Sequence, residues 1–132
     1  MDDRFETTRL RRSHLAVADN PRPGLDCVIT LSETFAGTSL PGPISISIRY
    51  VPDRHFLPQA GLSAYLAAIG TLDWDSLETL GAEIIGDLDS ELLPRWVQLR
   101  LEAAGATTHR VTFEQRKPDW QDRLMLSRIA LD

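Results

Sequence analysis

Residues 44–50 carry the strongest structural signal in this sequence. Apolar and polar side chains alternate there without a break: Ile44, Ile46, Ile48 and Tyr50 alternate with Ser45, Ser47 and Arg49. Because successive side chains of a strand point to opposite faces, this pattern predicts a β-strand with one apolar and one polar face. Any fold proposed for the chain must contain this strand.

A weaker alternation precedes that strand. Over residues 25–35, one face would carry Leu25, Cys27, Ile29 and Leu31. Residues 36–43 are rich in Gly, Pro and Ser and predict a loop. The two strands are therefore expected to form an antiparallel hairpin with a long connection.

Two helices are predicted to follow. The first begins after Pro58, presents Leu62, Tyr65, Leu66 and Ile69 at helical spacing, and ends at Gly70. The second begins near Asp75 and ends at Pro94. Its apolar stripe has a period near 3.6 residues and consists of Leu77, Leu80, Ile84, Ile85, Leu88 and Leu92.

Two further strands complete the expected order. One begins at Arg95 and places Val97, Leu99 and Leu101 on one face, and the other holds Val111 and Phe113 after a turn at residues 104–106. The order ββααββ predicts an α+β fold, a four-stranded antiparallel sheet with two helices on one face. Its edge strands would remain open. Open edges favour pairing with another chain, so a ring of copies that closes the sheets into a barrel is expected.

The ends of the chain are assigned separately from the domain at residues 25–117. Residues 1–24 read as an N-terminal arm, either solvated or reaching a neighbouring subunit, because they show no sustained period and end in Asn-Pro-Arg-Pro-Gly. Residues 118–132 predict a short amphipathic C-terminal helix with Trp120, Leu124 and Ile129 on its apolar side.

Composition excludes several classes of protein. The chain has 132 residues, of which 42% are hydrophobic and 25% charged, as in an average globular domain and unlike a disordered or collagen-like chain. Neither a membrane-spanning run nor a signal peptide is visible, so a cytoplasmic location and no membrane partner are expected. A net charge of −5 argues against nucleic acid as a partner. Cys27 is the only cysteine, so no intrachain disulfide can form.

Two stretches of the sequence resemble the tunnelling-fold (T-fold) superfamily. They are SISIRYVPDRHFL at residues 45–57, with the helix that follows, and ELLPRW at residues 91–96. They are most similar to the short form of the NADPH-dependent 7-cyano-7-deazaguanine reductases, over roughly residues 35–102. The resemblance implies a homo-oligomeric barrel with ligand sites between subunits, where a glutamate anchors a purine- or pterin-like ring.

The chain departs from that family at its catalytic positions. Counting without gaps places Phe35 where the reductases have their nucleophilic cysteine, and Gly42 where they have their general-acid aspartate. Residues 58–60, Pro-Gln-Ala, replace the motif that binds the nicotinamide phosphate. Phenylalanine cannot form a thioimide and glycine cannot relay a proton, so we expect neither reductase activity nor a cofactor.

Glu78 and Glu33 are the candidate ligand-binding residues. Glu78 aligns with the glutamate that anchors the ring, and a carboxylate can accept two N–H bonds from such a ring. Asp75 as N-cap with Glu78 three residues later would also form a capping box, so Glu78 has a purely structural interpretation as well. Glu33, near the mouth of the long loop, is the weaker candidate.

No metal site is predicted. His14, His55, His109 and Cys27 lie on different predicted elements and lack ligand spacing. Three functions remain open: a ring-binding protein without the reductase chemistry, an active pterin or deazapurine enzyme that uses other residues, and a structural ring without a ligand.

Overall fold

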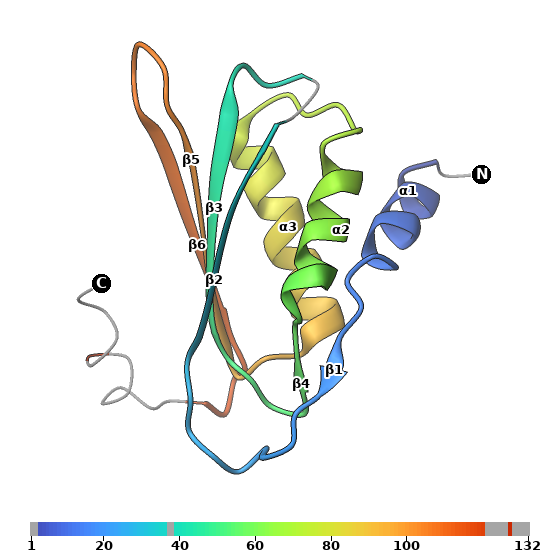
Figure 1. Cartoon of the computed structure of the whole chain (residues 1–132), viewed down its shortest axis with the longest axis vertical. Coiled ribbons are helices and arrows are strands. Elements are labelled where there is room, and N and C mark those ends of the chain that lie inside the picture. Colours follow the sequence, from blue (N-terminus) through green and yellow to red (C-terminus); the bar gives the residue numbers. More distant parts are fainter. Residues whose placement is uncertain (1–2, 37–38, 121–126, 128–132) are drawn as a thin grey trace.

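A four-stranded antiparallel sheet forms the centre of the computed structural model, which describes residues 3–36, 39–120 and 127 (Figure 1). The strand order is β2–β3–β5–β6, with β2 at Ile29–Ala36, β3 at Pro43–Val51, β5 at Trp96–Ala103 and β6 at His109–Arg116. The alternation predicted for residues 44–50 is confirmed, because Ile44, Ile46 and Ile48 are fully buried in the core. Ile48 lies opposite Leu31 on one side and Leu99 on the other.

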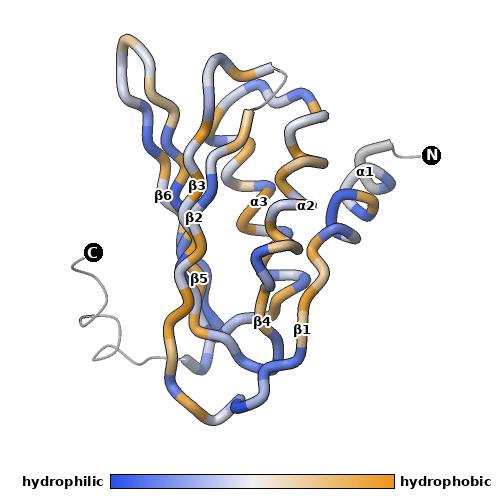
Figure 2. Tube along the Cα trace, viewed as in Figure 1, coloured by the Kyte–Doolittle hydropathy of each residue, from blue (hydrophilic) through white to orange (hydrophobic). Residues whose placement is uncertain are grey.

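Two helices cover one face of this sheet, as predicted. They are α2 at Gln59–Ile69 and α3 at Leu77–Leu92, and both lie on the same side of the strands in Figure 1. Hydrophobic segments of the helices and of the sheet lie between the two layers, whereas most of α1 is hydrophilic (Figure 2). The predicted α+β fold with the order ββααββ is therefore confirmed.

Helix α3 begins one residue later than the sequence suggested. Its N-cap is Ser76, whose Oγ accepts a hydrogen bond from the backbone N–H of Thr79 at 3.0 Å. The expected capping box between Asp75 and Glu78 is therefore wrong, because Asp75 lies outside the helix. The helix ends at Leu92, and its C-cap Leu93 adopts a positive φ of 50° before Pro94.

The N-terminal residues also differ from the expectation. They form helix α1 at Asp3–Arg12 and strand β1 at Ala18–Asp19, which pairs antiparallel with β4 at His55–Phe56. Arg11 and Leu15 are 6% and 5% exposed. A solvated arm is therefore wrong for this segment, because these two side chains are buried against the rest of the same chain. The division at residues 24 and 117 stays a prediction.

Buried Asp87 in α3 holds α1 in place. Its side chain is fully buried, and both of its oxygens accept hydrogen bonds. Arg11 donates from Nε at 2.6 Å and from Nη2 at 3.0 Å, Arg12 donates from Nε at 2.6 Å, and Tyr65 donates its hydroxyl. Burial alone would lower the pKa of Arg11, but bonding to Asp87 outweighs it and raises that pKa. Burial and the Asp87 charge raise the pKa of Tyr65 well above its ordinary value.

Trp120 is the last residue of the described segment after β6. Its ring stacks on Trp96, with centroids 6.5 Å apart, on the face of the sheet away from the helices. The predicted C-terminal helix falls almost entirely on residues 121–126 and 128–132, outside the described residues. No helix in the described part of the chain is both long and apolar enough to span a bilayer.

Asp53 is expected to make part of the stability depend on pH. Its Oδ2 accepts a hydrogen bond from Lys117 Nζ at 2.5 Å, and this bond lowers the pKa of Asp53 although burial opposes it. A carboxyl whose pKa is lower in the folded state stabilises the fold above its unfolded-state pKa and loses that effect as the pH falls through the folded-state value. Asp53→Asn should therefore reduce the loss of stability between neutral and acid pH.

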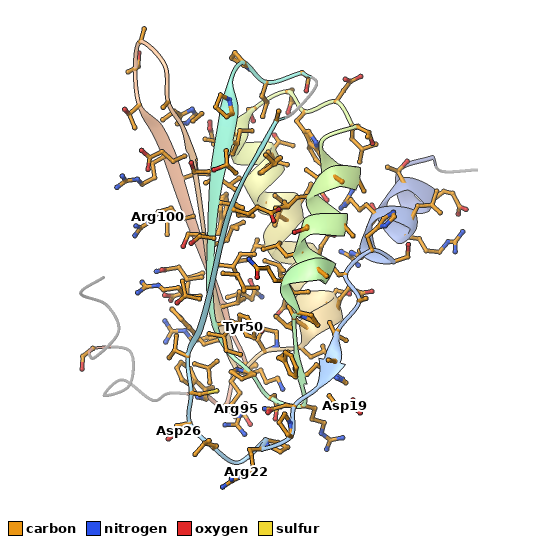
Figure 3. The ribbon with its side chains drawn as sticks, viewed as in Figure 1. Asp19, Arg22, Asp26, Tyr50, Arg95 and Arg100 are labelled. Atoms are coloured by element: carbon orange, nitrogen blue, oxygen red, sulfur yellow. The ribbon has the colours of Figure 1, made fainter. Side chains whose placement is uncertain are left out.

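Urea unfolding at a series of pH values measures this change. Asp26→Asn, at an exposed aspartate of the 20–28 loop (Figure 3), is the control and should keep the wild-type pH dependence. If Asp53→Asn loses as much stability as the wild type between neutral and acid pH, Asp53 is not the source of this pH dependence.

Candidate functional site

A cavity of about 640 Å³ lies at one end of the sheet. Three segments enclose it: the β2–β3 loop, the start of α3 and the β5–β6 hairpin. Its lining comprises Leu40, Pro41, Gly42, Ile44, Ser76, Leu77, Ala103, Ala104, Gly105, Ala106, Thr107 and His109. The volume is in the range of small-molecule pockets, and most of the lining is apolar, as a planar ring requires.

Glu78 lies beside this cavity, in the first turn of α3. Its Oε1 is 2.8 Å from Nε2 of His109, which belongs to the cavity wall. The Glu78 and His109 side chains are 59% and 53% exposed, so the carboxylate is accessible from solvent at the rim. The helix N-terminus also favours a negative charge at this position. Because Ser76 caps the helix, Glu78 has no capping role that would conflict with ligand binding.

Phe35 and Gly42, the two positions at which the sequence comparison expected catalytic groups to be missing, lie at or near the same cavity. Gly42 is part of its wall and has a φ of +75°, a backbone conformation that favours glycine. Phe35 is half-buried, packs against the core and pairs with Ile44 of the cavity wall. Neither residue offers a nucleophile or a proton donor there.

Cys27 is far from the cavity. It is half-buried and precedes β2 rather than lying within it, contrary to the predicted strand at residues 25–35. The β2 strand begins with Ile29 opposite Tyr50, while its cavity end places Phe35 opposite Ile44. The six steps from Ile29 to Phe35 along the strand span about 20 Å. The chain's only thiol therefore cannot reach a ligand in the cavity of the same subunit.

Glu33 lies at the other edge of the sheet from Glu78. It is on β2, and its Oε1 accepts a hydrogen bond from Ser63 Oγ of α2 at 2.5 Å. Glu78 instead contacts His109 on β6. Since β2 and β6 are the two opposite edges of the sheet, the two predicted ligand residues do not meet within one chain.

A second cavity, of about 620 Å³, lies between α1, the α2–α3 loop and α3. Arg11 forms part of its wall and lies over the Trp74 ring, 5.9 Å from the centroid. The Arg11 guanidinium already binds Asp87 and Glu83, so it is committed to holding α1. Among the described residues, no group of three His, Cys, Asp or Glu side chains is arranged to hold a metal ion.

Sequence reasoning proposed Glu78 as a ligand residue but missed its contact with His109. His109 had been weighed only as a metal ligand, although the antiparallel register of β5 and β6 brings the start of β6 back to the cavity end of the sheet. It also missed the Asp87 cluster. Asp87 falls on the buried stripe of α3, three residues after Ile84, and a carboxylate in such a place needs a buried cation.

Comparison with known proteins supports the fold. No protein-family model matches the chain, and no curated protein matches it in sequence. A solved structure, archaeosine synthase QueF-Like in the apo form, superposes with a TM-score of 0.60. The two proteins are 13% identical, and the match covers 66% of this chain and 91% of the other. At this identity the likeness shows the fold alone, and that fold is the T-fold.

Proposed function

From the T-fold that the chain shares with archaeosine synthase QueF-Like, we propose that it binds a purine- or pterin-like ring beside Glu78. The site lies where copies of the chain meet, and it lacks the nitrile-reductase chemistry. The observation that carries this proposal is the carboxylate of Glu78 at the rim of a ring-sized, mostly apolar cavity.

The cavity supplies the two kinds of contact that such a ligand requires. Its apolar wall, which includes Ile44 and Leu77, would pack against the faces of the ring. The Glu78 carboxylate would accept N–H bonds from the amide and amine edge, and bonds to a charged acceptor are strong and directional. His109 would then exchange its contact with Glu78 for a place beside the ligand.

The open edges of the sheet support a site between copies. Within the described residues, β2 and β6 each pair on one side only, and each edge strand is eight residues long. Such edges present unpaired backbone groups that another copy can satisfy. Pairing of β6 with β2 of a neighbour would bring the Glu33 edge of one copy toward the Glu78 edge of the next, so that the two candidate residues belong to one composite site.

The lost catalytic groups support binding without reduction. Phe35 offers no nucleophile and Gly42 no acid beside the cavity, and Cys27 lies about 20 Å of strand away. The chain therefore binds the ring without attacking it.

Replacing Glu78 with glutamine tests the binding site. Guanine, pterin and 7-deazaguanine compounds should raise the melting temperature of the wild-type protein, and Glu78→Gln should weaken binding at least about tenfold, because an amide accepts these N–H bonds less strongly than a carboxylate. Glu91→Gln makes the same change at the far end of α3, away from the cavity, and should bind like the wild type. Equal affinity in all three proteins would mean that Glu78 does not anchor the ring. No ligand effect at all would favour a structural ring without a ligand.

Light scattering tests the assembly. We expect a closed homo-oligomer whose mass stays constant over a wide range of protein concentration, because closure removes every free edge. A folded monomer would contradict the intersubunit part of the proposal. It would leave open whether Glu78 binds a ring within one chain, and the melting experiment decides that point.

A further inference from the structure

Apart from an apolar end at Val51 and Trp96, the sheet face turned away from the helices is polar and positively charged. Its strands present Thr30, Ser32, Thr34, Ser45, Ser47, Arg49, Gln98, Arg100, Glu102, Arg110, Thr112, Glu114 and Arg116. Four of these are arginines and two are glutamates, although the chain as a whole carries −5. This face therefore concentrates positive charge on an acidic protein.

Three of the four arginines have partners on the same face. Arg49 binds Gln98 at 2.7 Å, Arg110 binds Glu102 at 2.9 Å and Arg116 binds Glu114 at 2.6 Å, each from an Nη2. The two ion pairs neutralise both glutamates, and the guanidinium groups of Arg49, Arg110 and Arg116 each already have an acceptor.

Arg100 is the exception. It lies in the middle of β5, opposite Ser47, and its side chain points away from the helices (Figure 3). Within the described part of the chain, its side chain makes no hydrogen bond and no ion pair, and its Nε is shielded from solvent without an acceptor. A shielded donor without an acceptor is costly, so this guanidinium is set up to receive one.

A hollow of about 330 Å³ adjoins Arg100. It is lined by Ser32, Glu33, Thr34, Ser45, Ile46, Ser47, Arg100 and Glu102. Ser47 lies between Ser32 and Arg100 in the register, and Ser45 lies between Thr34 and Glu102, so four hydroxyl groups surround the hollow. Hydroxyl groups can donate to an anion. Of the two glutamates in the wall, Glu102 is already neutralised by Arg110, and the carboxylate of Glu33 accepts a hydrogen bond from Ser63 of α2, on the helix side of the sheet.

We propose that this hollow binds a phosphate-type oxyanion through the guanidinium of Arg100 and the surrounding hydroxyl groups. A planar guanidinium binds two oxygens of such an anion at once, and the strands hold the donors rigidly. The site lies on the opposite side of the sheet from the α3 helix that carries Glu78, so it does not depend on the proposed ring-binding function.

Titration with inorganic phosphate tests this site. Binding is followed at constant ionic strength through the amide NMR signals of residues 32, 34, 45 and 47, because non-specific attraction is screened by salt. Saturable shifts are expected in the wild type. Arg100→Gln should weaken phosphate binding at least about tenfold while leaving the melting temperature unchanged, because Arg100 supports no other residue.

Arg116→Gln is the matched control, because it removes the same charge from the same face but away from the hollow. It should bind phosphate like the wild type. Equal weakening in both variants, or no saturation in the wild type, would overturn the proposal. Acetate is titrated in parallel, and binding as tight as that of phosphate would overturn the assignment to a phosphate-type anion.

Discussion

Asp87→Ala is expected to destabilise the protein by about 3–5 kcal/mol, the range measured when one partner of a buried ion pair is removed. Asp87 is fully buried, and its carboxylate accepts hydrogen bonds from Arg11, Arg12 and Tyr65. Arg12 is 31% exposed and can turn toward water, but Arg11 is only 6% exposed and would keep only Glu83, a 48% exposed carboxylate, as its ion-pair partner. The loss of stability should therefore exceed that of the lost hydrogen bonds alone.

Urea unfolding measures this loss. Asp89→Ala, on the same helix but only half-buried and outside the cluster, is the matched control and should change the free energy of unfolding by less than about 1 kcal/mol. Near-equal destabilisation by the two variants would contradict the role given to Asp87.

A double variant separates the cost of an unpaired charge from the loss of packing. Arg11→Met combined with Asp87→Leu removes both buried charges and fills the space with apolar atoms, so it should recover most of the stability lost in Asp87→Ala. If the double variant is as unstable as Asp87→Ala, the cluster stabilises the fold through its hydrogen bonds rather than by pairing charges.

Local patterns predicted the fold well because each one reports a single physical requirement. Alternation at residues 44–50 requires a half-buried strand, and the order of the elements then left few arrangements for the helices. The boundary of α3 was missed because Asp75 and Ser76 are both good N-caps, and only the hydrogen bond from Thr79 to Ser76 distinguishes them. The α1 helix was missed because its stability comes from Asp87, 75 residues away from Arg12, and not from its own sequence pattern.

The sequence could propose single residues for the candidate site, but not the contacts between residues that are far apart in the chain. Glu78 was proposed because of the resemblance to the reductases, and it stays a prediction, but its contact with His109 depends on how β6 returns beside α3. The sequence does not distinguish Arg100 from the other polar residues of an alternating strand. Only the structure shows that its Nε lacks an acceptor among the described residues, whereas a neighbouring arginine such as Arg110 has one.

Gly61→Ala is expected to destabilise the protein by about 1–3 kcal/mol, although alanine normally favours a helix. Gly61 lies in the first turn of α2, against the segment that joins α1 to β1. A Cβ on Gly61 would lie 2.9 Å from the carbonyl oxygen of Ala16, closer than real Cβ atoms approach. Ala16 cannot easily move away, because Arg11 is bound to Asp87 on one side of it and Ala18 pairs with Phe56 on the other.

Gly86→Ala provides the contrast in thermal and urea unfolding. Gly86 lies inside α3, and an added Cβ would meet only the Arg12 Nη2, at 4.0 Å. This variant should therefore gain about 0.5–1 kcal/mol from the lower entropy of its unfolded chain. The two substitutions add the same methyl group. If one lowers and the other raises the free energy of unfolding, the difference is due to the contact with Ala16. A stabilising Gly61→Ala would mean that the segment between α1 and β1 is not held against α2.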